Sequence, residues 1–217
     1  MKVGSLFCGA GGLDLGLIQA GLNIAWAFDS CKDCISTYRQ NIGSHAEVLD
    51  VTAVNFTELA SIDLIVGGFP CQGFSMANKH RAGSDERNFL YHEFVRAVKE
   101  QSPKFFLAEN VRGILSLEKG EAIKKIVSDF SDVGYSVEYK LFNAADYGVP
   151  QNRYRVFISG IRNDLSGSVT RVWPEPTTPI DKVSIGQALS NIPEPDSDHS
   201  LLNHIGSQYK ITNRNYI

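Results

Sequence analysis

Phe7-Cys8-Gly9-Ala10-Gly11-Gly12 begins at the last residue of the apolar run at residues 3–7 and leads into the helical pattern of Leu13, Leu17 and Ile18. A glycine-rich turn between a strand and a helix lets backbone amides approach a ligand at the helix N-terminus. The stretch therefore predicts the first strand, turn and helix of an α/β fold. Taken alone, it fits a dinucleotide site, an S-adenosylmethionine site or a plain tight turn equally well.

Apolar runs of strand length alternate with helical patterns through the first part of the chain. Such alternation predicts a mostly parallel sheet with helices on both faces. Two later strands, at residues 136–141 and 154–161, are expected to form an antiparallel edge of that sheet. The earlier expected strands are at residues 3–7, 24–28, 62–66 and 105–108.

The composition is that of an ordinary globular protein, because 43% of the 217 residues are hydrophobic and 21% are charged. The formal net charge of -3 argues against a protein that holds nucleic acid by bulk charge. No apolar run reaches the roughly 20 residues of a membrane span, and the first residues do not form a signal-peptide pattern. A cytoplasmic protein without membrane contact is expected.

The four cysteines, Cys8, Cys31, Cys34 and Cys71, are expected to remain thiols in a reducing compartment. The spacing of Cys31-Lys32-Asp33-Cys34 suggests a metal or redox site, but no second Cys or His pair completes it. Its pattern also places it inside a helix. We therefore expect no metal site.

The stretch Gly67-Gly68-Phe69-Pro70-Cys71-Gln72 sets a cysteine in a loop directly after the apolar run at residues 64–66. A thiol at the exit of a strand is well placed to act as a nucleophile. Cysteines are more often buried structural residues, but no apolar periodicity follows Gln72. Glu109 likewise follows the run at 105–108, at the carboxyl end of a strand, where open sheets bind ligands.

Two aspartates are expected to end consecutive strands beside the glycine turn. Asp29 could accept hydrogen bonds from both hydroxyls of a ribose, and Asp50 could accept one from an exocyclic amine. Each alone is more often a helix cap. Together they indicate an adenosine-type ligand. Of Arg153 and Arg155, just before or within the last strand, at most one need enter the site.

These motifs, in this order, resemble those of DNA (cytosine-5) methyltransferases. The resemblance implies a Rossmann-like S-adenosylmethionine-dependent methyltransferase fold and methyl transfer to C5 of cytosine in duplex DNA by a nucleoid-associated enzyme, with S-adenosylhomocysteine as product. The motifs are the glycine turn with Leu13, the Pro70-Cys71-Gln72 loop ending in Phe74-Ser75, Glu109-Asn110-Val111, Asn143-Ala144-Ala145-Asp146-Tyr147-Gly148-Val149-Pro150-Gln151, and Arg153 with Arg155.

The resemblance also implies roles for individual residues. The catalytic set is Cys71, Glu109, Arg153 and Arg155. The cofactor set is Phe7, Gly9, Ala10, Gly11, Gly12, Leu13, Asp29, Asp50, Val51, Pro70 and Leu90. The substrate-loop set is Gln72, Ser75, Lys79, Arg81, Arg87, Asn110, Val111 and Gln151. Asp29 stands where the family more often has Glu, and Ser5 stands where it often has Asp.

The division expected from the resemblance is a cofactor-binding and catalytic domain at 1–165 and a Pro-rich segment at 166–217. This segment is expected to lead toward a target-recognition domain that the chain lacks. A second polypeptide could supply that domain and the family's final cofactor-pocket segment, and a restriction-modification system is the expected setting. Two alternatives stay open: methylation of an RNA cytosine, and a non-catalytic cofactor-binding subunit.

Overall fold

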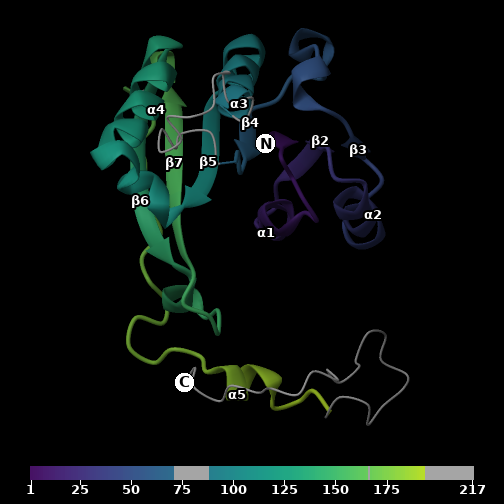
Figure 1. The fold of residues 1–217 in the computed structure, drawn as a ribbon, viewed down its shortest axis with the longest axis vertical. Coiled ribbons are helices and arrows are strands. Elements are labelled where there is room, and N and C mark those ends of the chain that lie inside the picture. Colours follow the sequence, from purple (N-terminus) through teal and green to yellow (C-terminus); the bar gives the residue numbers. More distant parts are fainter. Residues whose placement is uncertain (71–87, 166, 194–217) are drawn as a thin grey trace, which may run out of the picture. The chain divides into compact units, whose positions relative to one another are not determined.

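The structure is a computed structural model that describes residues 1–70, 88–165 and 167–193 (Figure 1). It divides into two compact units. The first comprises residues 1–143 and 153–175, and the second comprises residues 144–152 and 176–217. The boundary expected at residues 165 and 166 differs from this division, because 166–175 belong to the first unit and 144–152 to the second.

The first unit contains a seven-stranded sheet in the order β3-β2-β1-β4-β5-β7-β6. The pairs among β1 to β5 are parallel, and β7 is antiparallel to both β5 and β6. The predicted parallel sheet with an antiparallel edge is therefore confirmed. The strands are β1 Lys2–Leu6, β2 Asn23–Asp29, β3 Ala46–Val48, β4 Leu64–Gly67, β5 Phe105–Val111, β6 Tyr135–Asn143 and β7 Tyr154–Arg162.

Helices cover both faces of this sheet. The helices α1 and α2 share one hydrophobic core with β1, β2 and β4, in which Ile35 and Tyr38 are buried. The helices α3 and α4 share the other core, where the Phe106 and Phe130 rings stack. The α-helices of the first unit are α1 Gly12–Gln19, α2 Lys32–Asn41, α3 Asn88–Gln101 and α4 Glu121–Asp132.

Short 3-10 helices complete the connections. In the first unit they are η1 Val51–Ala53, η2 Phe56–Glu58, η3 Arg112–Leu115, η4 Leu117–Gly120 and η6 Asn163–Leu165. The end of this unit is anchored by Arg171, which donates to the carbonyls of Ser136 and Ser159 and pairs with Glu138 at 2.6 Å. The sheet edge is thus held to a segment that follows it in sequence.

The second unit contains η5 Ala144–Tyr147 and α5 Ile185–Leu189. The capping box expected at Ser184 and Gln187 is present. Within this unit, the Asp146 carbonyl accepts hydrogen bonds from the backbone N–H groups of Thr177 and Thr178, which joins its two stretches of chain.

The CxxC stretch differs from expectation at its first cysteine. Helix α2 begins at Lys32, and Cys31 is its N-cap, with Sγ accepting from the Cys34 N–H at 3.3 Å. The prediction that the motif lies within a helix is therefore wrong at Cys31. Among the described residues, no group of three or more His, Cys, Asp or Glu side chains could hold a metal ion. No helix in that part of the chain is long and apolar enough to cross a membrane.

Candidate active site

The glycine turn joins β1 to α1 in a backbone conformation that its glycines adopt readily. Phe7, Gly9 and Gly11 all have positive φ, at 55°, 54° and 90°. Gly11 also lies against α2, because a Cβ added there would come within 2.1 Å of Ile42. Gly12, by contrast, has open space where its Cβ would be. Gly11 is therefore required by packing, whereas Gly12 leaves an opening on the turn.

Asp29, at the end of β2, is bonded to the backbone around it. Its Oδ2 accepts from the Gly9 N–H at 2.9 Å, and its Oδ1 accepts from the Cys31 N–H at 2.8 Å. The carboxylate thus connects the glycine turn to the start of α2. A carboxylate has about four acceptor sites, so each oxygen keeps capacity for another donor such as a ribose hydroxyl.

Asp50 caps η1, the first 3-10 turn after β3. Its Oδ1 accepts from the Thr52 N–H at 2.9 Å and from the Thr52 hydroxyl at 2.7 Å. The backbone hydrogen bond from Thr52 lowers the pKa of this exposed carboxyl, and the hydroxyl bond adds to the effect. Val51, the next residue, is buried in the core. Asp50 is thus an ionised surface carboxylate next to a residue that the core holds in place.

Of the other predicted cofactor residues, Ala10 is exposed on the glycine turn, and three are partly buried: Leu13, Pro70 and Leu90. Leu13 on α1 packs against the core that α1 and α2 cover, and Leu90 on α3 packs against the opposite one. Pro70 is the last described residue before the gap that contains Cys71.

The backbone that leads to Cys71 is held by a buried asparagine. Asn110, 3% exposed, donates from Nδ2 to the carbonyl of Phe69 at 3.1 Å, while its Oδ1 accepts from the Val111 N–H. The Phe69 ring is itself 2% exposed and contacts the rings of Tyr91 and Phe94. Phe69 and Asn110 thus fix the chain two residues before Cys71, and Asn110 contacts protein backbone rather than open space.

Glu109 lies beside this backbone and pairs with Arg155. The parallel register sets Gly67 opposite Ala108, and a Cβ on Gly68 would come within 3.0 Å of Glu109 Oε2. Arg155 Nε lies 2.5 Å from Glu109 Oε1, with side chains 23% and 28% exposed. Because Arg155 reaches Glu109 from β7, the antiparallel edge brings together a carboxylate and a guanidinium that are 46 positions apart in sequence.

Arg153 lies just before β7 and is exposed, and its backbone N–H donates to Asn143 Oδ1 at 3.0 Å. Val111 is 43% exposed at the end of β5. Gln151 belongs to the second unit. The predicted residues Cys71, Gln72, Ser75, Lys79, Arg81 and Arg87 lie outside the described residues.

Two of the described cysteines are poorly suited to act as nucleophiles. Burial, helped by the negative charges of Asp14 and Asp29, raises the pKa of Cys8 to about 12. The pKa of Cys34 is raised to about 11, and the largest cause is its hydrogen bond with Cys31. Both therefore remain thiols near neutral pH, and the thiolate is the reactive form.

Sequence reasoning missed a buried polar chain beneath the glycine turn. Asp14, fully buried on α1, accepts from the Ser5 hydroxyl at 2.7 Å and from the Tyr38 hydroxyl at 2.8 Å. The Tyr38 hydroxyl lies 3.0 Å from His45 Nε2. A charged residue on the otherwise apolar first turn of α1 was the available signal.

The comparisons with known proteins decide the family. The model of the family described as "C-5 cytosine-specific DNA methylase" matches residues 1–216. The chain belongs to this family. Its sheet is therefore the Rossmann-like methyltransferase fold that the resemblance implied.

Several curated relatives are Type II methyltransferases. M.MthTI of Methanothermobacter thermautotrophicus is 39% identical over 217 residues, which are all of this chain and 64% of that protein. M.NgoFVII of Neisseria gonorrhoeae is 42% identical over 93% of this chain and 56% of that protein. The chain thus spans less than two thirds of the length of these relatives.

Solved structures agree on the fold. One described as a DNA modification methyltransferase from an E. coli prophage has a TM-score of 0.73 and 34% identity, over 89% of this chain and 56% of that one. The Dnmt2 methyltransferase of S. pombe has a TM-score of 0.62 at 19% identity, over 82% of this chain and 58% of that one, and shows the fold alone.

Proposed function

We propose that this chain is the cofactor-binding and catalytic part of an enzyme that methylates C5 of cytosine in duplex DNA, using S-adenosylmethionine. The observation that carries the proposal is the Glu109–Arg155 pair at the carboxyl end of the sheet, beside the backbone that leads to Cys71. An acid and a cation at that place suit a planar heterocycle with a ring nitrogen next to a carbonyl.

The residues around the glycine turn fit the cofactor. Gly9 and Gly12 leave open space where side chains would stand, and Asp29 and Asp50 present carboxylates at the ends of β2 and β3. We assign the ribose hydroxyls to Asp29 and the exocyclic amine of adenine to Asp50. When bound, S-adenosylmethionine supplies an electrophilic methyl group on its sulfonium.

The chemistry explains why the catalytic residue types are needed. Cytosine C5 is a weak nucleophile until a thiolate adds to C6, and Cys71 would supply that thiolate. Glu109 would hold N3 and deliver a proton to it as negative charge builds in the ring. Arg155 would bind the base carbonyl. C5 would then take the methyl group as S-adenosylhomocysteine departs, and loss of the C5 proton to water, departure of the Cys71 thiolate and return of the N3 proton to Glu109 would restore the aromatic ring. The cytosine must stay outside the duplex stack throughout.

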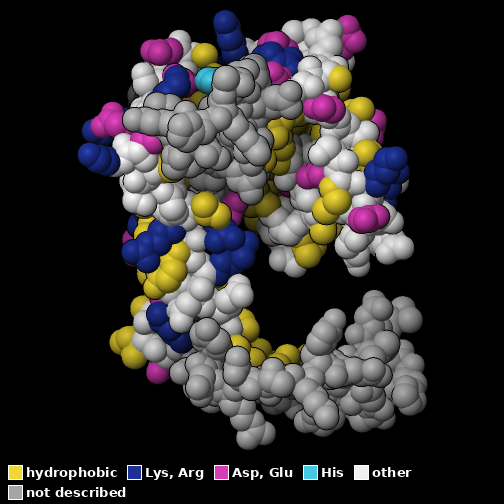
Figure 2. All heavy atoms as spheres, in the orientation of Figure 1, with side chains coloured by type: hydrophobic (Ala, Val, Ile, Leu, Met, Phe, Trp, Pro, Cys, Tyr) yellow, Lys and Arg dark blue, Asp and Glu magenta, His cyan; other side chains and the backbone are white. Residues whose placement is uncertain are grey.

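Basic and aromatic side chains near Arg155 support a nucleic-acid substrate. Arg112 lies over the Tyr154 ring at 5.3 Å, and Lys140 lies over the Phe142 ring at 5.5 Å. Figure 2 shows Lys and Arg side chains over the end of β6 and the start of β7 in the first unit. Because the net charge of the chain is -3, such a local cluster is the suitable way to contact phosphates.

The surface of α1 suggests that a further polypeptide segment completes the protein. Leu15 and Ile18 are 43% and 37% exposed on this helix. We propose that a segment of a second polypeptide, or of a longer form of this one, covers them. Leu15→Glu should then leave the unfolding temperature of this chain unchanged and lower activity only where that segment is present.

Covalent trapping tests the proposal without knowledge of the target sequence. Mixed-sequence duplex DNA is copied with 5-fluoro-dCTP, because fluorine at C5 prevents the final elimination and makes the adduct irreversible. Even slow reaction therefore accumulates product at micromolar protein. We expect a denaturant-resistant adduct that requires S-adenosylmethionine and is abolished by Cys71→Ala. An equally strong adduct from Cys71→Ala would refute the role of Cys71.

The same assay separates the alternatives. A structured RNA transcribed with 5-fluorocytidine tests the RNA substrate, and an adduct with RNA alone would overturn the DNA assignment. Cofactor binding without an adduct on either substrate, while M.MthTI forms one in parallel, would identify a non-catalytic subunit. Absence of binding to both S-adenosylmethionine and S-adenosylhomocysteine in calorimetry would overturn the cofactor assignment.

A further inference from the structure

The connection from β3 to β4 carries Asp50 and Val51 but has little regular structure of its own. It contains two single 3-10 turns, η1 and η2, capped by Asp50 and Asn55. Each turn closes few backbone hydrogen bonds, so neither is stable by itself. Contacts with the rest of the protein must therefore fix the conformation of this connection.

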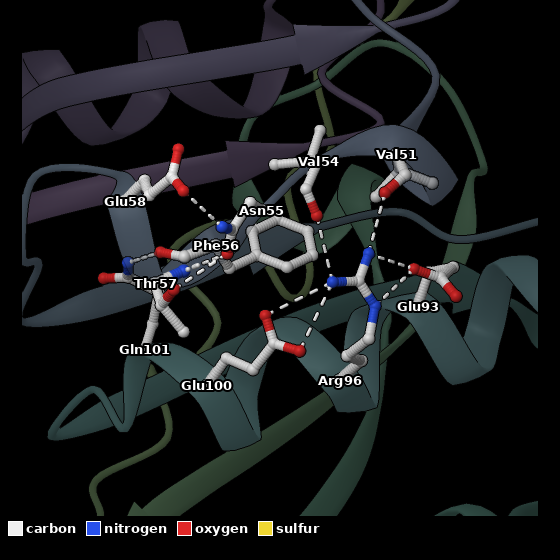
Figure 3. Close-up of polar contacts among 10 residues, drawn as sticks. All are labelled: Val51, Val54, Asn55, Phe56, Thr57, Glu58, Glu93, Arg96, Glu100 and Gln101. Atoms are coloured by element: carbon white, nitrogen blue, oxygen red, sulfur yellow. Dashed lines mark hydrogen bonds and ion pairs between the residues drawn. The ribbon is translucent and has the colours of Figure 1, made fainter.

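Arg96 of α3 supplies two of these contacts. Its Nη2 donates to the carbonyl of Val51 and its Nη1 donates to the carbonyl of Val54, each at 3.0 Å (Figure 3). The two carbonyls lie at the start and the end of η1. One guanidinium therefore spans the turn that follows Asp50.

The guanidinium is itself oriented by its neighbours. Nε donates to Glu93 Oε2 at 2.7 Å, and Nη1 donates to Glu100 Oε2 at 3.2 Å. Its plane also lies over the Phe56 ring of η2, 4.6 Å from the ring centroid. Figure 3 shows these groups converging on Arg96 from α3 on one side and the connection on the other. Gln101 adds a hydrogen bond to the Phe56 carbonyl.

We propose that Arg96 is a positioning residue that holds Asp50 and Val51 where the adenine of the cofactor binds, an inference that rests on the function proposed above. A lysine cannot replace it, because a single ammonium lacks the planar fork that reaches two carbonyls and two carboxylates together. The side chain of Val51 is buried and its carbonyl is bonded to Arg96, so displacement of η1 would move Asp50 as well.

Arg162 offers a matched control. It too pairs with a carboxylate, Asp164 at 2.7 Å, and donates to a backbone carbonyl, that of Ser102. Its side chain is 31% exposed, against 29% for Arg96. Arg162 is the last residue of β7 and bonds to the connection between α3 and β5 rather than to the one between β3 and β4. Arg162→Lys therefore reports the general cost of replacing such an arginine.

Calorimetry with two ligands tests the proposal. We expect Arg96→Lys to weaken S-adenosylhomocysteine binding about tenfold, which is about 1.4 kcal/mol, and Arg162→Lys to change it less than about twofold. S-inosylhomocysteine replaces the exocyclic amine by oxygen, which Asp50 cannot bind. The preference of the wild type for the adenosine ligand should therefore fall in Arg96→Lys and persist in Arg162→Lys.

The outcomes are separable. An unchanged preference in Arg96→Lys, with both variants losing equal unfolding temperature, would show that Arg96 serves stability alone. A wild-type chain that binds neither ligand would refute the proposed cofactor rather than the role of Arg96 in the connection. Arg96→Lys binding as tightly as wild type would overturn the positioning role directly.

Discussion

The two halves of the proposed site are built by different means. In the cofactor half, carboxylates accept hydrogen bonds from backbone N–H groups: Asp29 accepts from Gly9, and Asp50 accepts from Thr52. Around the sheet end, side chains hold one another, as Arg155 holds Glu109. We therefore expect changes in the cofactor half to alter affinity and packing, and changes in the base half to alter the rate.

The largest expected effect is in the base half. Glu109→Gln should lower the single-turnover rate of methyl transfer about 10²- to 10⁴-fold, because the proton donor to N3 is lost while the shape is kept. Glu138→Gln removes a carboxylate that pairs with Arg171 on the same sheet edge, and it should leave the rate unchanged. Equal losses of rate in Glu109→Gln and Glu138→Gln would show that the Glu109–Arg155 pair contributes to folding alone.

Substitutions at two neighbouring glycines of the turn should separate the effect on packing from the effect on ligand binding. Gly11→Ala should destabilise the protein by about 2 kcal/mol, because it combines a positive φ with a clash against Ile42. Gly12→Ala meets no atom within 4 Å and should keep stability while weakening cofactor binding. Urea unfolding and calorimetry measure the two effects. If Gly11→Ala unfolds at the wild-type urea concentration, the close approach to α2 is unimportant.

Asp29→Ala should raise the cofactor dissociation constant about tenfold or more with a much smaller change in the saturated rate. A ribose contact is made about equally in the ground and transition states, so its loss affects binding rather than chemistry. Titration of the rate with S-adenosylmethionine distinguishes the two. A fall in the saturated rate at unchanged affinity would move Asp29 into the catalytic half.

The smallest effect concerns Asp14. Burial raises its pKa, against the hydrogen bonds from Ser5 and Tyr38 and the charge of His45. The folded protein therefore holds this proton more tightly than the unfolded chain does. The stability that this provides is present below the usual carboxyl pKa and falls as pH rises through the folded pKa.

Asp14→Asn cannot lose a proton, and its amide can still reach Ser5 and Tyr38. We expect the unfolding free energy of the wild type, relative to Asp14→Asn, to decrease as pH rises through the raised pKa of Asp14. Urea titrations at several pH values measure the difference. A difference that stays constant with pH would mean that Asp14 has the same protonation in both states.

The sequence by itself determined most of the order of strands and helices, because periods of 2 and 3.6 residues are local properties of the chain. The three-residue strand β3 was not among the strands expected from apolar runs, because it is too short to show such a period. It also placed the glycine turn, since Gly9 and Gly11 occupy positions with positive φ that few residues adopt. The resemblance, carried by five ordered motifs, led to the family that the comparisons established. The start of α2 was misjudged because Cys31 caps the helix through Sγ, an unusual acceptor for that role.

Only the tertiary structure decided which of these residues meet. Arg155 reaches Glu109 because β7 rather than β6 pairs with β5, a choice that the predicted antiparallel edge left open. Asn110 proved to hold the Phe69 carbonyl, although the sequence grouped it with the substrate loop. The anchoring of η1 by Arg96 joins elements 45 positions apart. Such contacts depend on strand order and register, which are set by long-range burial and hydrogen bonding rather than by neighbouring residues.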